Sequence, residues 1–275
     1  MSEDKPEAPR VADLLQGDVP PYLQRFIKKV GKTINEFGML AEGSETLLGI
    51  SGGKDSLAMA LALSVRRRWL PVTYKLSAAM VEWREHPLTS RQRENLHAFF
   101  DAIEVPFKTI EAGMFPESFK GRFNCYLCAR NRKRVLFEEL RETGFDRLAL
   151  GHHLDDIAET TLMNISMRGS FSTMMPVQKF FDGAVTLIRP LAQTPEEKIT
   201  AVADQLELPV VTINCPYRES NIRNDLKPLI RELRRINNHA RENIFRAGWN
   251  IDREYVPGLA EDLEELSAGS PEAWL

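Results

Sequence analysis

Residues 46–56 read Thr-Leu-Leu-Gly-Ile-Ser-Gly-Gly-Lys-Asp-Ser, an apolar run that stops at a pair of glycines. Such a run, followed by helix-forming residues, predicts a strand–loop–helix unit. Gly52 and Gly53 allow the backbone to bend tightly and to approach a ligand. Ser51, Ser56 and the free N–H groups of the new helix then face one spot, and phosphate is the natural ligand of such a helix start. We call residues 51–56 the glycine loop.

The spacing of the glycine loop excludes two common phosphate-binding motifs. A Walker loop has four residues between its first glycine and the following Gly-Lys, whereas Gly49 stands only four positions before Gly53. The dinucleotide fingerprint G-x-G-x-x-G is also absent. Asp55 and Ser56 suit the first turn of any helix, so an ordinary strand–helix turn remains the alternative.

Strands alternate with helices along most of the chain. This order predicts an α/β fold, Rossmann-like, with a parallel sheet covered by helices on both faces and with extra helices at the N- and C-terminal sides. The expected strands are 46–50, 72–81, 107–110, 147–150, 185–188 and 209–213. The expected helices are 20–37, 55–68, 89–103, 126–143, 155–167, 195–206 and 222–246, the last with Pro228 as a break or a first-turn residue.

Length and composition predict an ordinary globular protein. The 275 residues, 43% hydrophobic and 27% charged, suit one large or two modest domains, and we place a single folded domain at residues 19–250. Residues 1–18 are expected to be a disordered tail and residues 251–275 an acidic tail. No apolar run approaches a membrane span and no signal-peptide core is visible, so we expect a cytoplasmic protein without a membrane partner. Three cysteines are too few for a disulfide framework.

The net charge of −3 hides an uneven distribution. Residues 118–137 contain six basic and no acidic residues, and residues 218–247 contain eight basic against four acidic residues. Solvated helix faces explain either segment alone, but together they allow a positive face for nucleic acid on an acidic protein.

A second motif, Gly151-His-His-Leu-Asp-Asp, follows the strand expected at 147–150. It places His152, His153, Asp155 and Asp156 at the same sheet edge as the glycine loop, because ligands of parallel sheets bind at the carboxyl ends of the strands. Carboxylates beside a phosphate site can hold Mg²⁺. The alternative is a capped helix start. The spacing is not one known for zinc.

The three cysteines are Cys125 and Cys128, in a C-x-x-C motif, and Cys215. The motif alone leaves a redox pair, half of a zinc site and an iron–sulfur site open. A four-cysteine zinc site within one chain is excluded by the count. Cys215 follows the strand expected at 209–213, at the sheet edge of the glycine loop, where three thiolates could converge. Three thiolates on a 4Fe–4S cluster leave one iron without a protein ligand. For Cys215 taken alone, the alternative is a buried apolar cysteine, which is the commoner situation of a single cysteine.

These motifs and their order resemble the tRNA 2-thiocytidine synthetase family, the tRNA-thiolating branch of the PP-loop ATP pyrophosphatases. The resemblance covers roughly residues 20–248. It implies that ATP is bound by Ser51, Gly52, Gly53, Lys54, Asp55, Ser56, Met80, Arg132, Gly151 and Asp156. It further implies Mg²⁺ at Asp156, a 4Fe–4S cluster on Cys125, Cys128 and Cys215, and catalytic roles for these cysteines, Asp55 and Asp156. Met80 matches a backbone position near adenine, at the end of its strand.

The resemblance also implies a reaction and partners. The C2 oxygen of a cytidine in the tRNA anticodon loop is adenylated, and sulfur carried by the cluster replaces it. A cysteine desulfurase or free sulfide donates the sulfur, and a homodimer is expected. The chain lacks the cysteine-rich zinc fingers of the 2-thiouridine synthetases, although Cys215-Pro-Tyr resembles that branch, so the target base stays open. Two other function classes are alternatives. A lysidine-synthetase-like ligase or an amidotransferase partner would use ATP without iron. A nucleotide-binding module without catalysis would leave the clustered His and Asp residues without a role.

Overall fold

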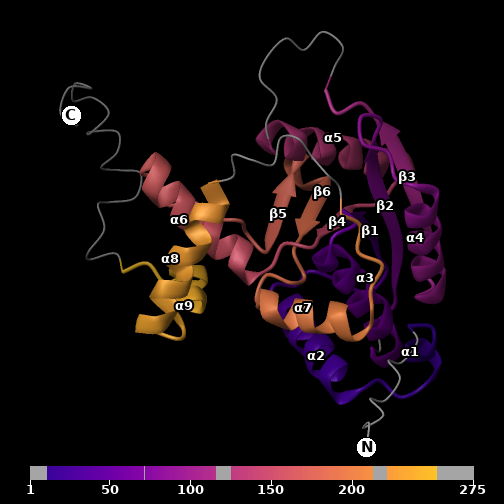
Figure 1. The fold of residues 1–275 in the computed structure, drawn as a ribbon, viewed down its shortest axis with the longest axis horizontal. Helices are drawn as coiled ribbons and strands as arrows, with labels where there is room; N and C mark the ends of the chain where they lie inside the picture. Colours follow the sequence, from indigo (N-terminus) through magenta and orange to yellow (C-terminus); the bar gives the residue numbers. More distant parts are fainter. Residues whose placement is uncertain (1–10, 71, 116–124, 213–221, 253–275) are drawn as a thin grey trace, which may run out of the picture.

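Six strands form one sheet in the computed structural model, which describes residues 11–70, 72–115, 125–212 and 222–252. The strands are β1 (Ser44–Ile50), β2 (Tyr74–Trp83), β3 (Phe107–Ala112), β4 (Arg147–Leu150), β5 (Val177–Phe180) and β6 (Val185–Ile188). Their order is β3-β2-β1-β4-β6-β5, and only β5 runs antiparallel to its neighbour (Figure 1). The strand β1 is central and buried along nearly its whole length, as expected for a parallel strand covered on both faces.

Helices cover both faces of this sheet, and a further group lies beside its β5 edge (Figure 1). They are α1 (Asp13–Gln16), α2 (Pro21–Glu36), α3 (Lys54–Arg66), α4 (Ser90–Ala102), α5 (Cys125–Thr143), α6 (Leu154–Arg168), α7 (Glu196–Gln205), α8 (Ile222–Ile236) and α9 (Ala240–Ala247), with short 3₁₀ turns at Arg67–Trp69 and Phe181–Gly183. Side chains of α2, α3, α4 and α7 share the larger core, and α5 covers the opposite face with a smaller one. Figure 1 shows both layers. The expected α/β fold with helices on both faces is confirmed.

Local sequence explains where these helices begin. Thr89 caps α4 through a capping box with Gln92, in which each side chain accepts the other residue's backbone N–H. The helix α3 has no side-chain cap and is held by its packing instead, because every residue from Ser56 to Arg66 is buried. It lies between the sheet and the outer helices, so it holds the glycine loop at its own N-terminus rigidly against the sheet.

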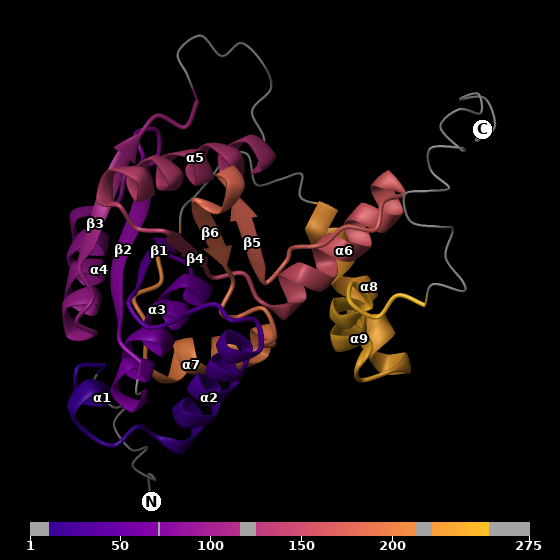
Figure 2. The same ribbon diagram turned by 180° about the vertical axis from the view of Figure 1, so that it is seen from behind.

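Three helices, α6, α8 and α9, pack on one another beside the β5 edge of the sheet (Figures 1 and 2). We call them the helical arm. Phe245 of α9 packs with Leu154 and Ile157 of α6 within the arm. It joins the arm to the body through Ala192 and through an edge-on ring contact with Phe37, after α2. Among the described helices, none is both long enough and apolar enough to cross a membrane.

Two strand expectations were wrong. Residues 209–212 do not form a strand in the described part of the chain; instead the backbone N–H of Val211 donates to the carbonyl of Gly52 at 2.9 Å. The strand β5 was missed because it has only four residues and two of them, Gln178 and Lys179, are exposed at the sheet edge. Both differences arise from tertiary contacts that a local pattern does not contain.

Two helix expectations also need correction. Within the expected tail 1–18, Asp13–Gln16 form α1 and Leu14 is fully buried in the core. Pro228 is neither a break nor a first-turn residue but lies inside α8, which is stabilised by the buried Leu226 and Ile230; the break comes at residues 237–239. The domain boundaries at 19–250 and the acidic tail 251–275 stay predictions.

The core of the larger layer can be tested at Phe100, which is fully buried and stacks on Phe107 with ring centroids 4.4 Å apart. Phe100→Ala removes this packing and leaves a cavity, so we expect it to lower the free energy of unfolding by about 3–5 kcal/mol. Phe181→Ala is the control, because that ring is 65% exposed, and it should cost under about 1 kcal/mol. Urea denaturation measures both, and equal losses would contradict the assignment of this core.

Candidate active site

The glycine loop lies at the point where the strand order reverses. From β1 the chain builds β2 and β3 on one side, then returns to β4 on the other side of β1. The crevice between the carboxyl ends of two such strands is where open α/β sheets bind their ligands. The glycine loop follows β1 and Gly151 follows β4, so the two sequence motifs meet at this crevice as expected.

Two glycines are required by the space around them. A Cβ atom at position 151 would lie 2.9 Å from the backbone N of Ser56 and 3.0 Å from the carbonyl carbon of Asp55. At position 52 a Cβ atom would lie 3.0 Å from the Cβ of Val211, and the φ of +79° there is one that side chains other than glycine rarely adopt. The backbones of the two motifs are therefore in direct contact.

The serine side chains fix the shape of the glycine loop. The hydroxyl of Ser56 accepts from the backbone N–H of Ser51 at 3.2 Å and donates to the carbonyl of Gly53 at 2.9 Å. The N–H of Gly53 donates to the Ser51 hydroxyl at 3.3 Å. The N-cap residue of α3 is Gly53, and no side chain caps the helix, so its positive end is left open beside the crevice.

A cavity of about 270 Å³ opens beside the glycine loop, between α3, the end of β4 and α5. It is lined by Gly49, Ile50, Ser51, Asp55, Ser56, Ala129, Arg132, Lys133, Leu136, Leu150, Gly151, His152 and Asp156. Polar groups from three separate segments therefore converge on one space with an apolar wall, which is the usual make-up of a small-molecule site.

The α5 wall of the cavity is cationic. Arg132 lies over the Trp83 ring at 5.8 Å, and its Nε has no hydrogen-bond partner among the described residues. Burial lowers the pKa of Lys133, and Arg189 and Arg130 lower it further. Burial also lowers the pKa of Arg189 to about 10, although nearby Asp156 raises it. Arg189 was not predicted as a site residue, because its place near Asp156 depends on the pairing of β6 with β4.

The opposite wall is acidic and is organised by a histidine. His153 is buried and caps α6: its Nδ1 accepts the backbone N–H of Asp156 at 3.4 Å, while the Asp156 carboxylate accepts the N–H of His153 at 3.0 Å. The His153 Nε2 also lies 3.8 Å from the Asp55 carboxylate. The two interpretations of this motif, a capped helix start and a catalytic carboxylate, are therefore compatible, because Asp156 both caps α6 and lines the cavity.

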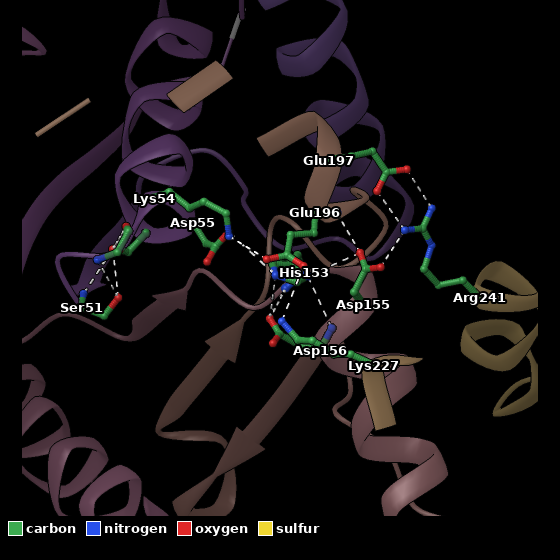
Figure 3. A network of polar contacts seen from close by, with 12 residues as sticks. Ser51, Lys54, Asp55, His153, Asp155, Asp156, Glu196, Glu197, Lys227 and Arg241 are labelled. Carbon is green, nitrogen blue, oxygen red and sulfur yellow. Dashed lines mark hydrogen bonds and ion pairs between the residues drawn. The ribbon is translucent and has the colours of Figure 1, made fainter. Parts of the chain in front are cut away.

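Lys54 does not face the cavity in this structure. Its Nζ donates to Asp55 at 3.0 Å and to Glu196 at 2.9 Å (Figure 3). Burial lowers the pKa of Lys54, but the hydrogen bonds to Glu196 and Asp55 more than offset this, so the pKa is raised. Glu196 begins α7 and was not predicted as a site residue. Its position directly after Pro195 predicts the start of a helix but indicates no function.

The cysteine motif lies at the start of α5. Cys125 is the first residue of that helix and is exposed, and Cys128 is half-buried one turn later, directly before the cavity-lining Ala129. Cys215 lies outside the described residues. Among residues 11–70, 72–115, 125–212 and 222–252, no three His, Cys, Asp or Glu side chains form a group that could hold a metal ion.

Met80 differs from its expected place. The strand β2 continues to Trp83, so Met80 is not at its end, although it pairs with Ile50, the last residue of β1. Its side chain is buried against Gly52, where a Cβ atom would lie 3.3 Å from the Met80 Cε, and it is not among the residues lining the cavity.

Comparison with known proteins shows which family this chain belongs to. The family model described as PP-loop domain matches residues 22–233. The tRNA-cytidine(32) 2-sulfurtransferase of Cupriavidus taiwanensis is 31% identical over 262 residues, covering 90% of this chain and 83% of that protein. The enzyme of the same name from Pelobacter propionicus is 32% identical over 252 residues, covering 90% and 92%.

The chain belongs to the PP-loop family. Within it, the chain falls in the branch of the tRNA-cytidine 2-sulfurtransferases and is an enzyme, which confirms the family that its motifs resemble. The U34-tRNA thiolase NcsA from Methanococcus maripaludis, solved with its [4Fe–4S] cluster, superimposes with a TM-score of 0.70 at 24% identity over 87% of this chain and 84% of that one. At this identity the likeness confirms the PP-loop fold.

The contact between the two motifs gives a direct test. Gly151→Ala places a methyl group against the backbone of Asp55 and Ser56, so the glycine loop must move. We expect ATP binding, measured by calorimetry, to weaken by about tenfold or more, which corresponds to roughly 1.4 kcal/mol. Gly248→Ala is the matched control, because its Cβ atom would meet nothing closer than 3.8 Å. Unchanged ATP affinity in Gly151→Ala would show that this contact does not shape the site.

Proposed function

We propose that this enzyme is an ATP-dependent tRNA sulfurtransferase that replaces the C2 oxygen of a cytidine in the anticodon loop with sulfur. The cytidine is the one at position 32, the position printed in the names of its relatives. The observation that carries the proposal is the meeting of three motifs: the glycine loop and Gly151 are in backbone contact, and the helix that begins with the C-x-x-C motif forms the third wall of their cavity.

ATP fits this cavity as the activating substrate. The glycine loop offers backbone N–H groups and the positive end of α3 to the phosphates. Arg132 and Lys133 stand across the cavity and can neutralise the charge of the departing pyrophosphate. Lys54 is held by two carboxylates and would have to exchange a partner to reach a phosphate. Asp156 supplies the kind of carboxylate oxygen that Mg²⁺ prefers when it also binds phosphates.

The cysteines fit a 4Fe–4S cluster. Cys125 and Cys128 lie one helical turn apart on the cavity end of α5, and residues 211–212, which precede the segment of Cys215, lie beside the glycine loop through the bond from Val211 to Gly52. These three cysteines would hold the cluster. When bound, it supplies an iron without a protein ligand, at which the sulfur for transfer can be held.

The reaction needs ATP because the C2 oxygen of a pyrimidine is a poor leaving group. In the first step this oxygen attacks the α-phosphorus of ATP, the bond from that phosphorus to the bridging oxygen breaks, and pyrophosphate leaves. Sulfide then adds to C2, and AMP departs with the former C2 oxygen. The residues of this chain bind the phosphates, stabilise the charge of both leaving groups and hold the two substrates together.

The tRNA is proposed to lie over the basic residues of α5 and the helical arm. Arg130 and Arg134 are exposed on α5, next to the cavity-lining Arg132 and Lys133, and binding through such residues weakens steeply with salt. The target base must leave its stack to reach the cavity. We further propose a homodimer in the cytoplasm, supplied with sulfur by a cysteine desulfurase or by free sulfide.

Nucleoside analysis of tRNA tests the function directly. In a strain that lacks the gene, we expect one thiolated cytidine to disappear, because its C2 oxygen is then no longer activated by this enzyme. Mass spectrometry of digested tRNA measures this loss. Restoring the gene should bring the nucleoside back, and a gene encoding Asp156→Ala should not. Loss of a thiolated uridine instead would show that this enzyme acts on uridine, as the U34-type enzymes do. Loss of lysidine would show that it is a non-redox ligase.

The cysteines give a second test. Protein purified without oxygen and reconstituted should contain iron and sulfide, and Cys125→Ala, Cys128→Ala and Cys215→Ala should each lose thiolation while ATP binding stays within about twofold of wild type. Iron and sulfide assays and calorimetry measure these quantities. A colourless protein after reconstitution, or full thiolation by Cys215→Ala, would contradict the proposed cluster.

A further inference from the structure

Arg241, near the start of α9, is almost completely buried although it carries a charge. Its side chain is 3% exposed, and its Nη1 donates to the Asp155 carboxylate at 2.6 Å and to Glu197 at 3.0 Å. Its Nη2 donates to the other oxygen of Glu197 at 3.1 Å. Burial alone would lower the pKa of Arg241, but its two carboxylate partners raise it instead. The guanidinium therefore joins three helices that are distant in the sequence: α6, α7 and α9 (Figure 3).

Asp155 passes this anchoring on to the site. One of its oxygens accepts from Arg241, and the other accepts the backbone N–H of Glu196 at 2.8 Å. Since Pro195, at the N-cap of α7, offers no side-chain bond, Asp155 caps α7 from a different helix. Asp155 also stands next to Asp156 in the first turn of α6, with its carboxylate 3.7 Å from the Nδ1 of His153.

The same network reaches the glycine loop through α7. Glu196, whose backbone Asp155 caps, holds the Lys54 side chain at 2.9 Å. Burial raises the pKa of Glu196, but Lys54 outweighs this and leaves it lowered. A continuous set of charge-assisted bonds thus runs from Arg241 in the helical arm, through Asp155 and the start of α7, to Lys54 beside the phosphate cradle.

We propose that Arg241 is a positioning residue for the ATP site: it holds Asp155, and through it the carboxylates of α6 and the start of α7, in the arrangement that ATP and its magnesium need. This inference rests on the proposed ATP-dependent function. It makes the adenylation site depend on the helical arm, since α9 contributes no side chain to the cavity itself. The guanidinium suits this task because its fixed fork engages two carboxylates at once.

The test compares Arg241→Lys with Arg25→Lys, a control that makes the same exchange at an exposed position of α2, away from the cavity and the helical arm. Lysine keeps the charge of Arg241 but loses the fork, so Asp155 and Glu197 are no longer held together. We expect Arg241→Lys to weaken ATP binding, measured by calorimetry with Mg²⁺ and without tRNA, by roughly 10- to 100-fold, the usual effect of removing a group that orients a binding carboxylate. Binding of tRNA should stay within about twofold, and the control should match wild type.

Glu197→Gln provides a milder second variant in case Arg241→Lys does not fold. It loosens the same guanidinium from its more exposed partner, since the Glu197 side chain is 49% exposed, and should weaken ATP binding in the same direction. Wild-type ATP affinity in whichever of these variants folds would overturn the positioning role, as would a loss confined to tRNA binding. If wild-type protein binds ATP tightly but never thiolates tRNA, the proposed function fails while the role of Arg241 in ATP binding stands.

Discussion

The backbone of Gly151 lies against the backbone of Asp55 and Ser56, and the arrangement of the site depends on this contact. It brings the residue that follows β4 so close to the first turn of α3 that a side chain at position 151 does not fit. As a result, the positive start of α3 and the carboxylates of α6 face the same space. A site that must bind phosphates and their magnesium needs opposite charges at this short range, held by backbone that does not yield.

Charge balance is the second constraint on the site. On one side Arg132 and Lys133 meet the cavity from α5, and partial burial lowers the pKa of Lys133. On the other side, the acidic residues are each occupied: Asp156 by the cap of α6, and Asp155 by Arg241 and the start of α7. We attribute this network to the geometry that it fixes, because a buried ion pair by itself adds little to stability once the cost of removing its charges from water is included.

Most of the fold could be predicted from the sequence because glycines clearly mark the ends of the central strands. The glycine pair at 52–53 and Gly151 each mark a parallel strand end, and the apolar runs before them are buried as a central sheet requires. The strand expected at 209–213 failed for a tertiary reason: Val211 bonds to Gly52 rather than to a neighbouring strand. The short β5 was missed because its exposed residues hide the alternation of an edge strand.

The same reasoning explains which site residues were found. Residues within a compact motif, such as Asp156 and the glycine loop, are visible because several chemical groups stand close together in the sequence. Arg189, Glu196 and Arg241 were not visible, because each interacts with a motif residue from an element far along the chain and none belongs to a motif itself. Their roles follow only from the packing of β6, α7 and α9 around the ends of β1 and β4.

In the proposed reaction, this cavity joins ATP to an oxygen of a tRNA base so that the oxygen can leave. This reaction is tested most directly with tRNA whose C2 oxygen at cytidine 32 is replaced by oxygen-18. After thiolation in ordinary water, the account predicts that the heavy oxygen is recovered in AMP, because the α-phosphorus is attacked by that oxygen. Heavy oxygen found in inorganic phosphate or pyrophosphate, or released only into water, would contradict the account.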